Sequence, residues 1–460
     1  MQKTIQPLPS SFRDPSGFVF ERDGVLYRQV NNVFSEDFDH FISSGCYEHL
    51  TRNNWLISHE EIDDLFERDI ACYKILKPEK IPFISYPYEW SFDMLKDAAL
   101  LTLRLVTESS AYGAMLKDAS PANVQWLNGR PVFIDSLSFE KYDPSHPWIA
   151  YRQFCENFVA PLLLMHHLQQ PMNALLLAWP DGIPLSMVRT MLPWRSKFSF
   201  HTYLHIHLHA RLASKATARS ALTQVNFSAK KLRRLVDSLT SLIESLEWRG
   251  KTSWDNYYAE ASQRGHYLKL KKNIVAAWIN EIPGLRKAID FGANEGEFSR
   301  LLSTKNMRTI AVDFDHSAVN KLYQNMKNSA GQLILPLLVD LANPSPAAGV
   351  NNKERLSFME RADADIGLGL ALVHHLCIGK NIPFEKICEL FKCTTNYLVI
   401  EFVPKGDDKV QFMLREKKDI YYNYTEENFL DAFTKDFSIL KREPVGDSGR
   451  TIFLMKNAAR

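Results

Sequence analysis

The sequence predicts two domains: an α+β domain with a helical extension at residues 1–248, and an α/β Rossmann-like domain at residues 249–460. Three observations lead to this prediction. The chain has 460 residues, which is too many for one typical hydrophobic core. Residues 147–245 have the apolar spacing of successive helices. After a further helix at about 254–280, strand and helix patterns alternate to the end of the chain, so the boundary falls near Trp248.

The first domain begins with the pattern of a β-hairpin. Two β-rich runs in residues 17–30 flank Asp23-Gly24, a strong turn dipeptide. Residues 36–65 are mostly helical in pattern. Residues 90–110 carry apolar side chains at helical spacing and predict an amphipathic helix. A second hairpin is expected around Asn128-Gly129.

Three polar residues follow the 90–110 helix in a suggestive spacing. Asp118 and Asn123 are spaced as D-x-x-x-x-N, and Asp135 comes after the second hairpin. This resembles the catalytic loop of protein kinases and of sugar or antibiotic kinases, where the first Asp orients the acceptor hydroxyl and the other two residues hold magnesium. The resemblance is incomplete, because Leu116 stands where kinases have a histidine and no glycine-rich phosphate loop precedes it.

We therefore predict a degenerate, kinase-like N-terminal domain that serves as a scaffold or binds substrate. One alternative is a nucleotide-binding or active phosphotransferase domain that uses ATP and Mg²⁺ at Asp118, Asn123 and Asp135. The other is that the spacing arose by chance, because D-x-x-x-x-N is a short pattern.

The second domain is predicted from residues 288–315. An apolar run ends at Asp290, and Gly292 and Gly296 follow; a helical segment and a second β-type run then lead to Asp313. Strand, glycine turn, helix, strand and acid form the first half of a nucleotide-binding Rossmann unit. Gly292 lets the backbone approach a ligand without a Cβ in the way, and Asp313 can accept both hydroxyls of a ribose.

The composition of the glycine turn indicates which nucleotide binds. A dinucleotide site has the pattern G-x-G-x-x-G, but Asn294 replaces the middle glycine here. Glu295 and Glu297 would repel a pyrophosphate at a helix N-terminus. A cationic ligand without phosphate, such as S-adenosylmethionine, fits better. The alternative is an α/β domain that kept the turn and binds nothing.

Polar residues also follow the next predicted strands. Residues 333–339 lead to Asp340, which can reach the adenine or its ribose. Residues 365–372 lead to His374 and His375, at the edge where open parallel sheets bind ligands. Because histidine can act as a general base near neutral pH, we predict these two as catalytic residues. The alternative is that they line or cap the pocket without proton transfer.

A fifth strand, at residues 396–400, leads to Glu401. This acid is the third catalytic candidate, and it either binds substrate or only holds its loop. Residues 436–442 and 451–455 predict two antiparallel strands that close the sheet.

Several long strings resemble a known family. AIDFGANEGEFSRLL, AVDFD, LILPLLVDLANPSP, GLALVHHL and LVIEFVPKGDDKVQFML resemble class I methyltransferases, and more narrowly the bacterial group that includes rhizobial nodulation-protein methyltransferases. SYPYEWSFDMLKDAALLTL, MLKDASPANVQWLNGRPVFIDSLSFE and PWIAYRQFCENFVAPLLLM resemble the same group. The resemblance covers nearly the whole chain and implies an S-adenosylmethionine-dependent transferase with a methyltransferase-type sheet. It does not identify the acceptor, and the turn departs from the common small-residue form at Glu295.

Composition and charge narrow the class of protein. The 55 basic and 53 acidic residues balance to a net charge of +2, so nothing demands nucleic acid or an anionic membrane as partner. The six cysteines include no C-x-x-C pair and suggest no disulfide framework, which predicts a reducing, cytoplasmic location. No signal peptide and no membrane-spanning segment are expected.

Two clusters of polar residues admit a structural explanation as well as a functional one. His201, His205 and His209 have metal-ligand spacing on a helix, but no acid or cysteine stands nearby, so a packed or solvated helix is expected and no metal site. The basic residues of 230–234 are expected to form a solvated helix face, with an anion or nucleic-acid patch as the alternative.

The sequence therefore predicts methyl transfer from S-adenosylmethionine to an oxygen or nitrogen of a small-molecule, glycan or lipid-linked acceptor. One alternative is a bifunctional kinase–methyltransferase acting on a glycan or lipid-linked sugar. The other is a non-catalytic module that binds S-adenosylmethionine.

Overall fold

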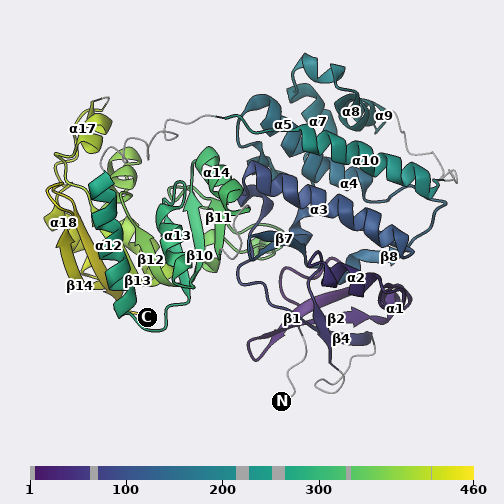
Figure 1. Ribbon diagram of the computed structural model, residues 1–460, viewed down its shortest axis with the longest axis horizontal. Helices are drawn as coiled ribbons and strands as arrows, with labels where there is room; N and C mark the ends of the chain where they lie inside the picture. Colours follow the sequence, from purple (N-terminus) through teal and green to yellow (C-terminus); the bar gives the residue numbers. More distant parts are fainter. Residues whose placement is uncertain (1–5, 63–70, 214–226, 251–264, 328–332, 416) are drawn as a thin grey trace. The chain divides into compact units, whose positions relative to one another are not determined.

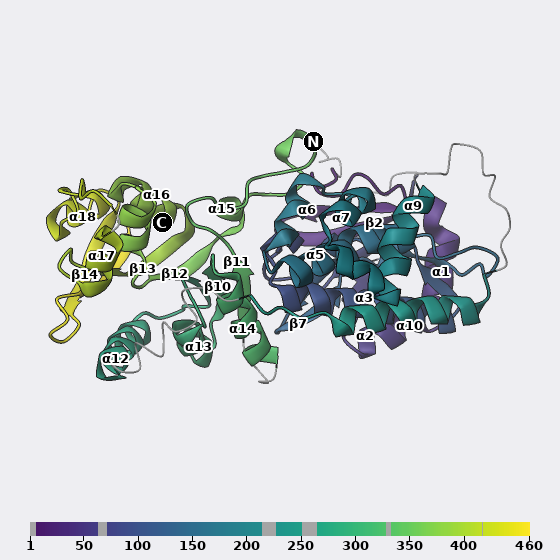
Figure 2. The ribbon, with the colours of Figure 1, turned by 90° about the horizontal axis from the view of Figure 1, so that it is seen from above.

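The computed structural model describes residues 6–62, 71–213, 227–250, 265–327, 333–415 and 417–460. Two compact units divide the chain (Figures 1 and 2). Unit 1 consists of Met1–Gly250 with Ala347–Arg355, and unit 2 consists of Lys251–Pro346 with Leu356–Arg460. A short segment from late in the sequence thus belongs to unit 1, where Glu354 forms an ion pair with Arg13 at 2.6 Å.

An antiparallel sheet with the strand order β1-β2-β4-β3 begins unit 1. Its strands are β1 (Gly17–Arg22), β2 (Val25–Asn31), β3 (His59–Glu61) and β4 (Cys72–Pro78). Asp23 and Gly24 have φ angles of 53° and 77°, the left-handed backbone that a two-residue hairpin turn requires. The predicted hairpin over residues 17–30 is therefore confirmed.

The helical prediction for residues 36–65 is correct only at its start. α1 (Ser35–Ser43) and α2 (Cys46–Arg52) form and are separated by Gly45, whose φ is 81°. Beyond them the chain enters β3, because residues 59–61 pair with β4 at the edge of the sheet. That pairing partner lies far along the sequence, so local periodicity does not reveal it.

The predicted amphipathic helix is α3 (Phe92–Ala111), and it is followed by two short strand pairs. β5 (Ala114–Leu116) pairs with β8 (Phe139–Lys141), and β6 (Val124–Leu127) pairs with β7 (Arg130–Phe133). Asn128 and Gly129 have φ angles of 52° and 76°, which confirms the second hairpin.

The rest of unit 1 is helical (Figure 1). Its elements are α4 (Tyr151–Phe154), η5 (Cys155–Val159), α5 (Ala160–Leu168), α6 (Leu175–Ala178), α7 (Leu185–Met191), η7 (Trp194–Phe198), α8 (Phe200–Thr202), η8 (Tyr203–Leu208), α9 (His209–Ala213) and α10 (Ala229–Ser245). His201 Nδ1 and His205 Nε2 both bond the Ser238 hydroxyl on α10, at 2.9 and 2.8 Å. These histidines therefore join helices, and across the described residues no cluster of His, Cys, Asp or Glu could hold a metal ion.

Unit 2 is built on a mixed sheet with the strand order β11-β10-β9-β12-β13-β15-β14. Its strands are β9 (Lys287–Phe291), β10 (Arg308–Asp313), β11 (Ile334–Leu338), β12 (Ala364–Gly369), β13 (Thr395–Phe402), β14 (Phe437–Pro444) and β15 (Thr451–Asn457). β9 to β13 run parallel, and β15 runs antiparallel between β13 and β14. This is a doubly wound sheet whose strand order reverses between β9 and β12, and ligands bind at such switch points.

Helices cover both faces of this sheet (Figure 2). α12 (Gly265–Glu281), α13 (Glu297–Thr304) and α14 (His316–Lys327) lie on one face, and α15 (Phe358–Arg361), α16 (Phe384–Thr394) and α18 (Glu426–Phe433) lie on the other. Val275 and Trp278 of α12 pack with Leu302 of α13 in the core cluster that covers β9 and β12. The covered sheet leaves the carboxyl ends of its strands as the place for a site.

Candidate cofactor site

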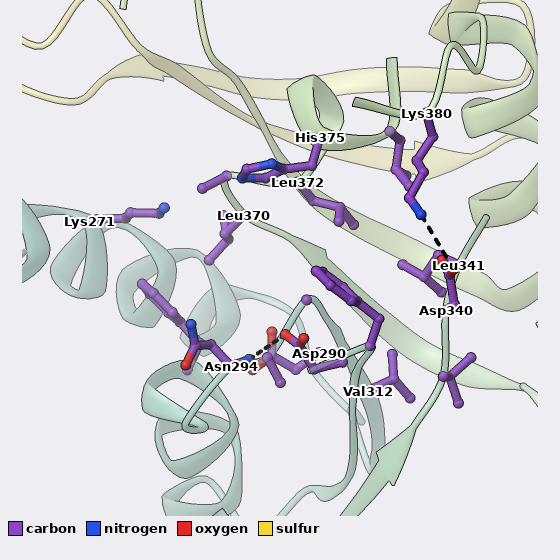
Figure 3. A pocket seen from close by; sticks show the side chains of 18 of the residues that line it. Lys271, Asp290, Asn294, Val312, Asp340, Leu341, Leu370, Leu372, His375 and Lys380 are labelled. Carbon is purple, nitrogen blue, oxygen red and sulfur yellow. Dashed lines mark hydrogen bonds and ion pairs between the residues drawn. The ribbon is translucent and has the colours of Figure 1, made fainter. Parts of the chain in front are cut away.

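A cavity of about 140 Å³ opens at the carboxyl ends of β9, β10, β11 and β12 (Figure 3). Its walls come from the loops that follow these strands and from α12. The lining residues are Tyr267, Leu268, Lys271, Asp290, Gly292, Ala293, Asn294, Phe298, Val312, Asp313, Phe314, Val339, Asp340, Leu341, Leu370, Ala371, Leu372, His375, Leu376 and Lys380. Five of the six predicted cofactor residues thus line one cavity, and Gly296 does not.

The glycine turn forms the floor of the cavity because its backbone is left-handed at three positions. Gly292, Asn294 and Gly296 have φ angles of 76°, 49° and 79°. A Cβ on Gly292 would meet Leu372 Cδ1 at 3.3 Å across the cavity, and a Cβ on Gly296 would meet Leu322 Cδ1 at 2.5 Å. Gly292 therefore keeps space open for a ligand, whereas Gly296 lets α13 start close to α14.

Asp290 lies at the end of β9 and is almost fully buried. Its carboxylate accepts a hydrogen bond from the Ser299 hydroxyl at 2.6 Å, which connects β9 to α13. The pKa of Asp290 is raised to about 6, mainly by burial and also by the neighbouring Asp313 carboxylate, while the hydrogen bond from the Ser299 hydroxyl opposes the rise.

Asp313 ends β10 and holds the turn from the other side. Its Oδ2 accepts the backbone N–H of Asn294 at 2.8 Å, and its Oδ1 accepts the backbone N–H of Asp315 at 2.9 Å. Burial raises the pKa of Asp313 to about 6, although these N–H groups oppose the shift. The side chain is thus an oriented, ionised acceptor at neutral pH.

Asp340 follows β11 at the rim of the cavity. Its Oδ1 accepts the backbone N–H of Ala342 at 2.9 Å, and Lys380 Nζ lies 3.7 Å from Oδ2 (Figure 3). Lys380 and Asp340 thus form a half-exposed ion pair at the rim.

Glu295 and Glu297 do not repel a ligand as the sequence predicts, because each is paired with cationic side chains. Glu295 pairs with Lys321 at 2.6 Å, and Glu297 pairs with Arg300 at 2.9 Å and with Lys272. Neither glutamate lines the cavity, so neutralising partners offset the repulsion that we assigned to them. The negative charge that faces the cavity comes instead from Asp290, Asp313 and Asp340. These three aspartates, and not the two glutamates, therefore favour a cationic ligand.

The structure separates the two histidines that follow β12. His375 lines the cavity opposite Asp290 and Asn294 (Figure 3), whereas His374 is 1% exposed and lies outside the lining. The two rings lie 4.1 Å apart. Burial, together with the charges of Arg450 and Lys409, lowers the pKa of His375 to about 4, so the ring is neutral at pH 7. Of the two, His375 alone reaches the cavity.

Glu401 lies inside the unit and not in the cavity wall. It is fully buried near the end of β13, where its Oε2 accepts from Lys271 Nζ at 2.5 Å and from the backbone N–H of Ala371 at 2.6 Å, and its Oε1 accepts from the Tyr267 hydroxyl at 2.5 Å. Burial alone would raise the pKa of Glu401, but the charges of Lys271 and Arg450 outweigh it and hold the pKa low. Both oxygens already have partners, so the position favours holding the loop over binding a substrate.

Helix α12 contributes lining residues that the sequence pattern does not predict. Tyr267 and Lys271 line the cavity, and Lys271 points from α12 toward it (Figure 3). Leu370 and Leu372 line it as well, because β12 ends at Gly369 and not at residue 372 as predicted. A lysine on an otherwise apolar helix face is the one available signal for Lys271.

The three kinase-like residues of unit 1 lie close together and bond one another and their neighbours. Asp118 accepts from Gln153 Nε2 at 2.7 Å and from Asn123 Nδ2 at 3.1 Å. Asp135 forms a largely buried ion pair with Arg28 at 2.5 Å. Every carboxylate oxygen of the two aspartates already accepts a protein donor.

Comparison with known proteins finds one relative along nearly the whole chain. The nodulation protein NoeA of Rhizobium meliloti (strain 1021) is 32% identical over 466 residues, which cover 97% of this chain and 95% of NoeA. No family model matches the chain.

Solved structures resemble parts of the chain at low identity. Magnesium protoporphyrin IX methyltransferase ChlM from Synechocystis PCC 6803 with bound SAH has 17% identity, covers 45% of this chain and 90% of its own, and gives a TM-score of 0.31. The N-methyltransferase NodS from Bradyrhizobium japonicum WM9 has 14% identity, with coverages of 44% and 98% and a TM-score of 0.29. The bifunctional kinase–methyltransferase WbdD has 13% identity, with coverages of 48% and 46% and a TM-score of 0.30.

The strand order of unit 2 and its closing antiparallel strand are those of the methyltransferase-type sheet that the sequence predicts. The match to NoeA covers 97% of this chain and therefore includes both units. The chain belongs to the family of the nodulation protein NoeA, and its unit 2 has the Rossmann-like fold of S-adenosylmethionine-dependent methyltransferases.

Proposed function

We propose that unit 2 binds S-adenosylmethionine in the cavity at the strand ends and transfers its methyl group to an oxygen or nitrogen of an acceptor. One observation carries the proposal: Asp290, Asp313 and Asp340 converge on a cavity whose floor is a glycine turn. Three carboxylates suit a ligand that has a sulfonium, an ammonium and ribose hydroxyls, and they oppose a pyrophosphate.

The roles of the cofactor residues follow from their chemistry. Asp313 accepts the ribose hydroxyls, and Asp340 accepts from the adenine or the ribose. Gly292 and Asn294 let the backbone approach the methionine end, beside Asp290. The Asn294 side-chain Oδ1 is buried and has no hydrogen-bond partner among the described residues, so it is free to accept from a bound ligand.

Bound S-adenosylmethionine supplies an electrophilic methyl group. The protein then needs to align the acceptor and to remove its proton. His375 lines the same cavity and its ring is neutral at pH 7. Its lowered pKa makes it a weak base, but an acceptor hydroxyl becomes strongly acidic as its oxygen gains the methyl group, so the ring can take that proton. The proposed acceptors are small-molecule, glycan or lipid-linked compounds. Because all six cysteines are free thiols, we also propose a reducing, cytoplasmic location.

For unit 1 we propose a kinase-like scaffold or substrate-binding role without phosphotransfer. The D-x-x-x-x-N spacing supports the kinase-like fold. The absence of phosphotransfer is supported by Asp118 and Asp135, whose carboxylate oxygens already accept hydrogen bonds from protein donors. A divalent cation would have to displace Arg28 from Asp135, and this costs the ion pair.

The test combines binding with turnover. Calorimetry should detect S-adenosylmethionine in the micromolar range, and the purified chain should not bind NAD⁺ at the same concentrations. Incubation with methyl-labelled S-adenosylmethionine and pools of glycans, lipid-linked sugars and small hydroxy or amino compounds should yield labelled product and S-adenosylhomocysteine. Failure to bind the cofactor would refute the proposal. Binding without product from any pool would favour the non-catalytic module.

A further inference from the structure

An aromatic face stands exposed on the helical part of unit 1. Trp194, Phe198, Phe200 and Tyr203 are 67%, 78%, 72% and 41% exposed, and they lie within ten residues of one another. They belong to η7, α8 and the start of η8. Soluble proteins rarely expose apolar side chains in such a group unless the surface binds something.

The polarity of this segment is inverted. Alongside the buried Ile206, most residues that this segment buries are polar and hydrogen-bonded: Ser196 and His207 are buried and bond each other at 2.9 Å. The buried His205 ring bonds the hydroxyls of Tyr151 and Ser238, each at 2.8 Å. A helix that only covered a soluble core would bury its rings and expose its polar groups. The hydrogen bonds of the buried polar side chains hold one side of the segment against the protein, so its aromatic rings lie on the solvent side.

The surrounding sequence is strongly basic. Between Asp181 and Asp237 the chain has no Asp or Glu, yet it contains ten Lys and Arg residues. Arg189, Arg195 and Lys197 are exposed, and the last two lie on η7 between Trp194 and Phe198. The net charge of the whole chain is only +2, so the remainder of the chain is acidic. This one region is therefore suited to a negatively charged surface.

A second basic group lies on the neighbouring helix. α10 carries exposed Lys230, Arg233 and Arg234, and its Ser238 hydroxyl bonds both His201 and His205. Figure 1 shows α7, α8, α9 and α10 grouped together in unit 1. The basic stripe of α10, whose function the sequence left open, thus belongs to the same part of the unit as the aromatic face.

We propose that this aromatic and basic face docks on the surface of an anionic lipid bilayer. Trp and Tyr prefer the headgroup level of a membrane, Phe side chains enter below it, and Lys and Arg pair with anionic headgroups. No helix in the described part of the chain is long and apolar enough to cross a membrane, so the attachment is peripheral. The proposal does not depend on methyl transfer.

A nucleic acid fits the geometry less well. The Trp194 and Phe198 rings meet edge to face, with centroids 5.4 Å apart and planes at 78°. Two rings in that arrangement cannot both stack on successive bases, as single-stranded nucleic acids require. Insertion into a bilayer has no such requirement for parallel rings.

The experiment is vesicle flotation of the full chain, without cofactor. Vesicles of phosphatidylcholine containing phosphatidylglycerol should carry the protein upward, vesicles of phosphatidylcholine alone should not, and added salt should weaken the binding. Phe198→Ser with Phe200→Ser, and separately Arg195→Gln with Lys197→Gln, should each lower the partition coefficient by about tenfold or more.

The matched control is Phe412→Ser with Arg415→Gln in unit 2. Phe412 is 64% exposed and Arg415 lies 5.9 Å from its ring, so this pair copies the chemistry at another site. The control should bind vesicles like the parent, and all variants should unfold at the parent's temperature because the changed side chains are exposed. Equal binding by parent and variants, or no binding to anionic vesicles, would overturn the proposal. So would binding to a single-stranded RNA oligomer in place of vesicles.

Discussion

At the scale of single residues, the Asp313 carboxylate lines the cavity and is the proposed acceptor of the ribose hydroxyls. Replacement of Asp313 by Ala removes the proposed acceptor of the ribose hydroxyls, so the affinity for S-adenosylmethionine should fall at least tenfold, about 1.4 kcal/mol. Isothermal calorimetry measures the loss. Asp363→Ala is the control, because Asp363 is an exposed acid of unit 2 that does not line the cavity. Unchanged affinity in Asp313→Ala would show that the ribose assignment is wrong.

The same residue should make cofactor binding depend on pH. The pKa of Asp313 is raised to about 6, and its ionised form accepts both ribose hydroxyls more strongly than the protonated form does, which keeps less acceptor capacity. The affinity should therefore be constant above about pH 7 and should decline as the pH falls through about 6, toward tenfold per unit. Dissociation constants measured from pH 5 to pH 8 test this. Asp313→Asn should bind more weakly and lose most of the pH dependence; a parent curve that stays flat to pH 5 would contradict the role of the carboxylate.

His375 and His374 should behave differently although they are adjacent. His375→Ala removes the proposed base from the cavity, so methyl transfer should fall by about a hundredfold or more while cofactor affinity is retained. His374→Ala leaves a void in the core and should lower stability more than turnover. Single-turnover rates, calorimetry and thermal unfolding separate these effects. If both variants keep full methyl transfer, proton abstraction by this pair is excluded.

At the scale of elements, a buried ion pair connects helix α12 to strand β13. Lys271 and Glu401 have side chains 5% and 0% exposed, and Lys271 also lines the cavity. The pair therefore fixes the helix that forms one wall of the cofactor site. Tyr267 and Arg450 extend the network, since the Tyr267 hydroxyl accepts from Arg450 at 3.1 Å.

Replacing one partner of this pair should lower the stability of the fold more than replacing both partners. Glu401→Gln leaves Lys271 buried and charged without a counter-ion, so we expect a loss of about 3–5 kcal/mol. Lys271→Met combined with Glu401→Gln removes the unpaired charge and should be less destabilising than Glu401→Gln alone. Hydrogen exchange of the β13 amides measures the local stability. The exposed pair Lys287–Asp363 provides the control, because Asp363→Asn should cost at most about 1 kcal/mol. Equal losses in the single and double variants would show that the pair is not coupled.

At the scale of the whole molecule, unit 1 should not need phosphotransfer for methylation. Titration with ATP and Mg²⁺ should show no magnesium-dependent binding, because the oxygens of Asp118 and Asp135 already accept protein donors. Asp135→Ala should leave methyl transfer unchanged and should weaken unit 1 by about 1–3 kcal/mol, since Arg28 loses its partner. Asp143→Ala, at an exposed acid, is the control. Tight, magnesium-dependent ATP binding that Asp135→Ala abolishes would promote the bifunctional alternative.

Elements with a local cause were predictable. The hairpins at Asp23-Gly24 and Asn128-Gly129 and the turn at Gly292 form because those residues adopt positive φ at little cost. The strands that lead to Asp290, Asp313 and Asp340 have apolar runs long enough to recognise, so their acids could be placed at one edge.

Features that depend on a distant partner were not predictable. β3 replaces the end of a predicted helix because it pairs with β4, and Glu401 is buried because Lys271, 130 residues earlier, neutralises it. The pairing of Glu295 and Glu297 with lysines is of the same kind. In each case the deciding contact joins residues that the sequence keeps apart.

The sequence by itself determined which residues gather at the strand ends, because a glycine turn and acids after parallel strands are local patterns that place five of the six proposed cofactor residues around one cavity. Only the tertiary structure decided which histidine reaches the cavity, since His374 and His375 differ only in the direction their side chains take after β12. It also decided that the aromatic rings of residues 194–203 stand outside, because buried polar contacts of Ser196 and His205 hold that segment's other face inward. The direction of a side chain and its burial depend on contacts with residues far along the chain, so the local sequence does not determine them.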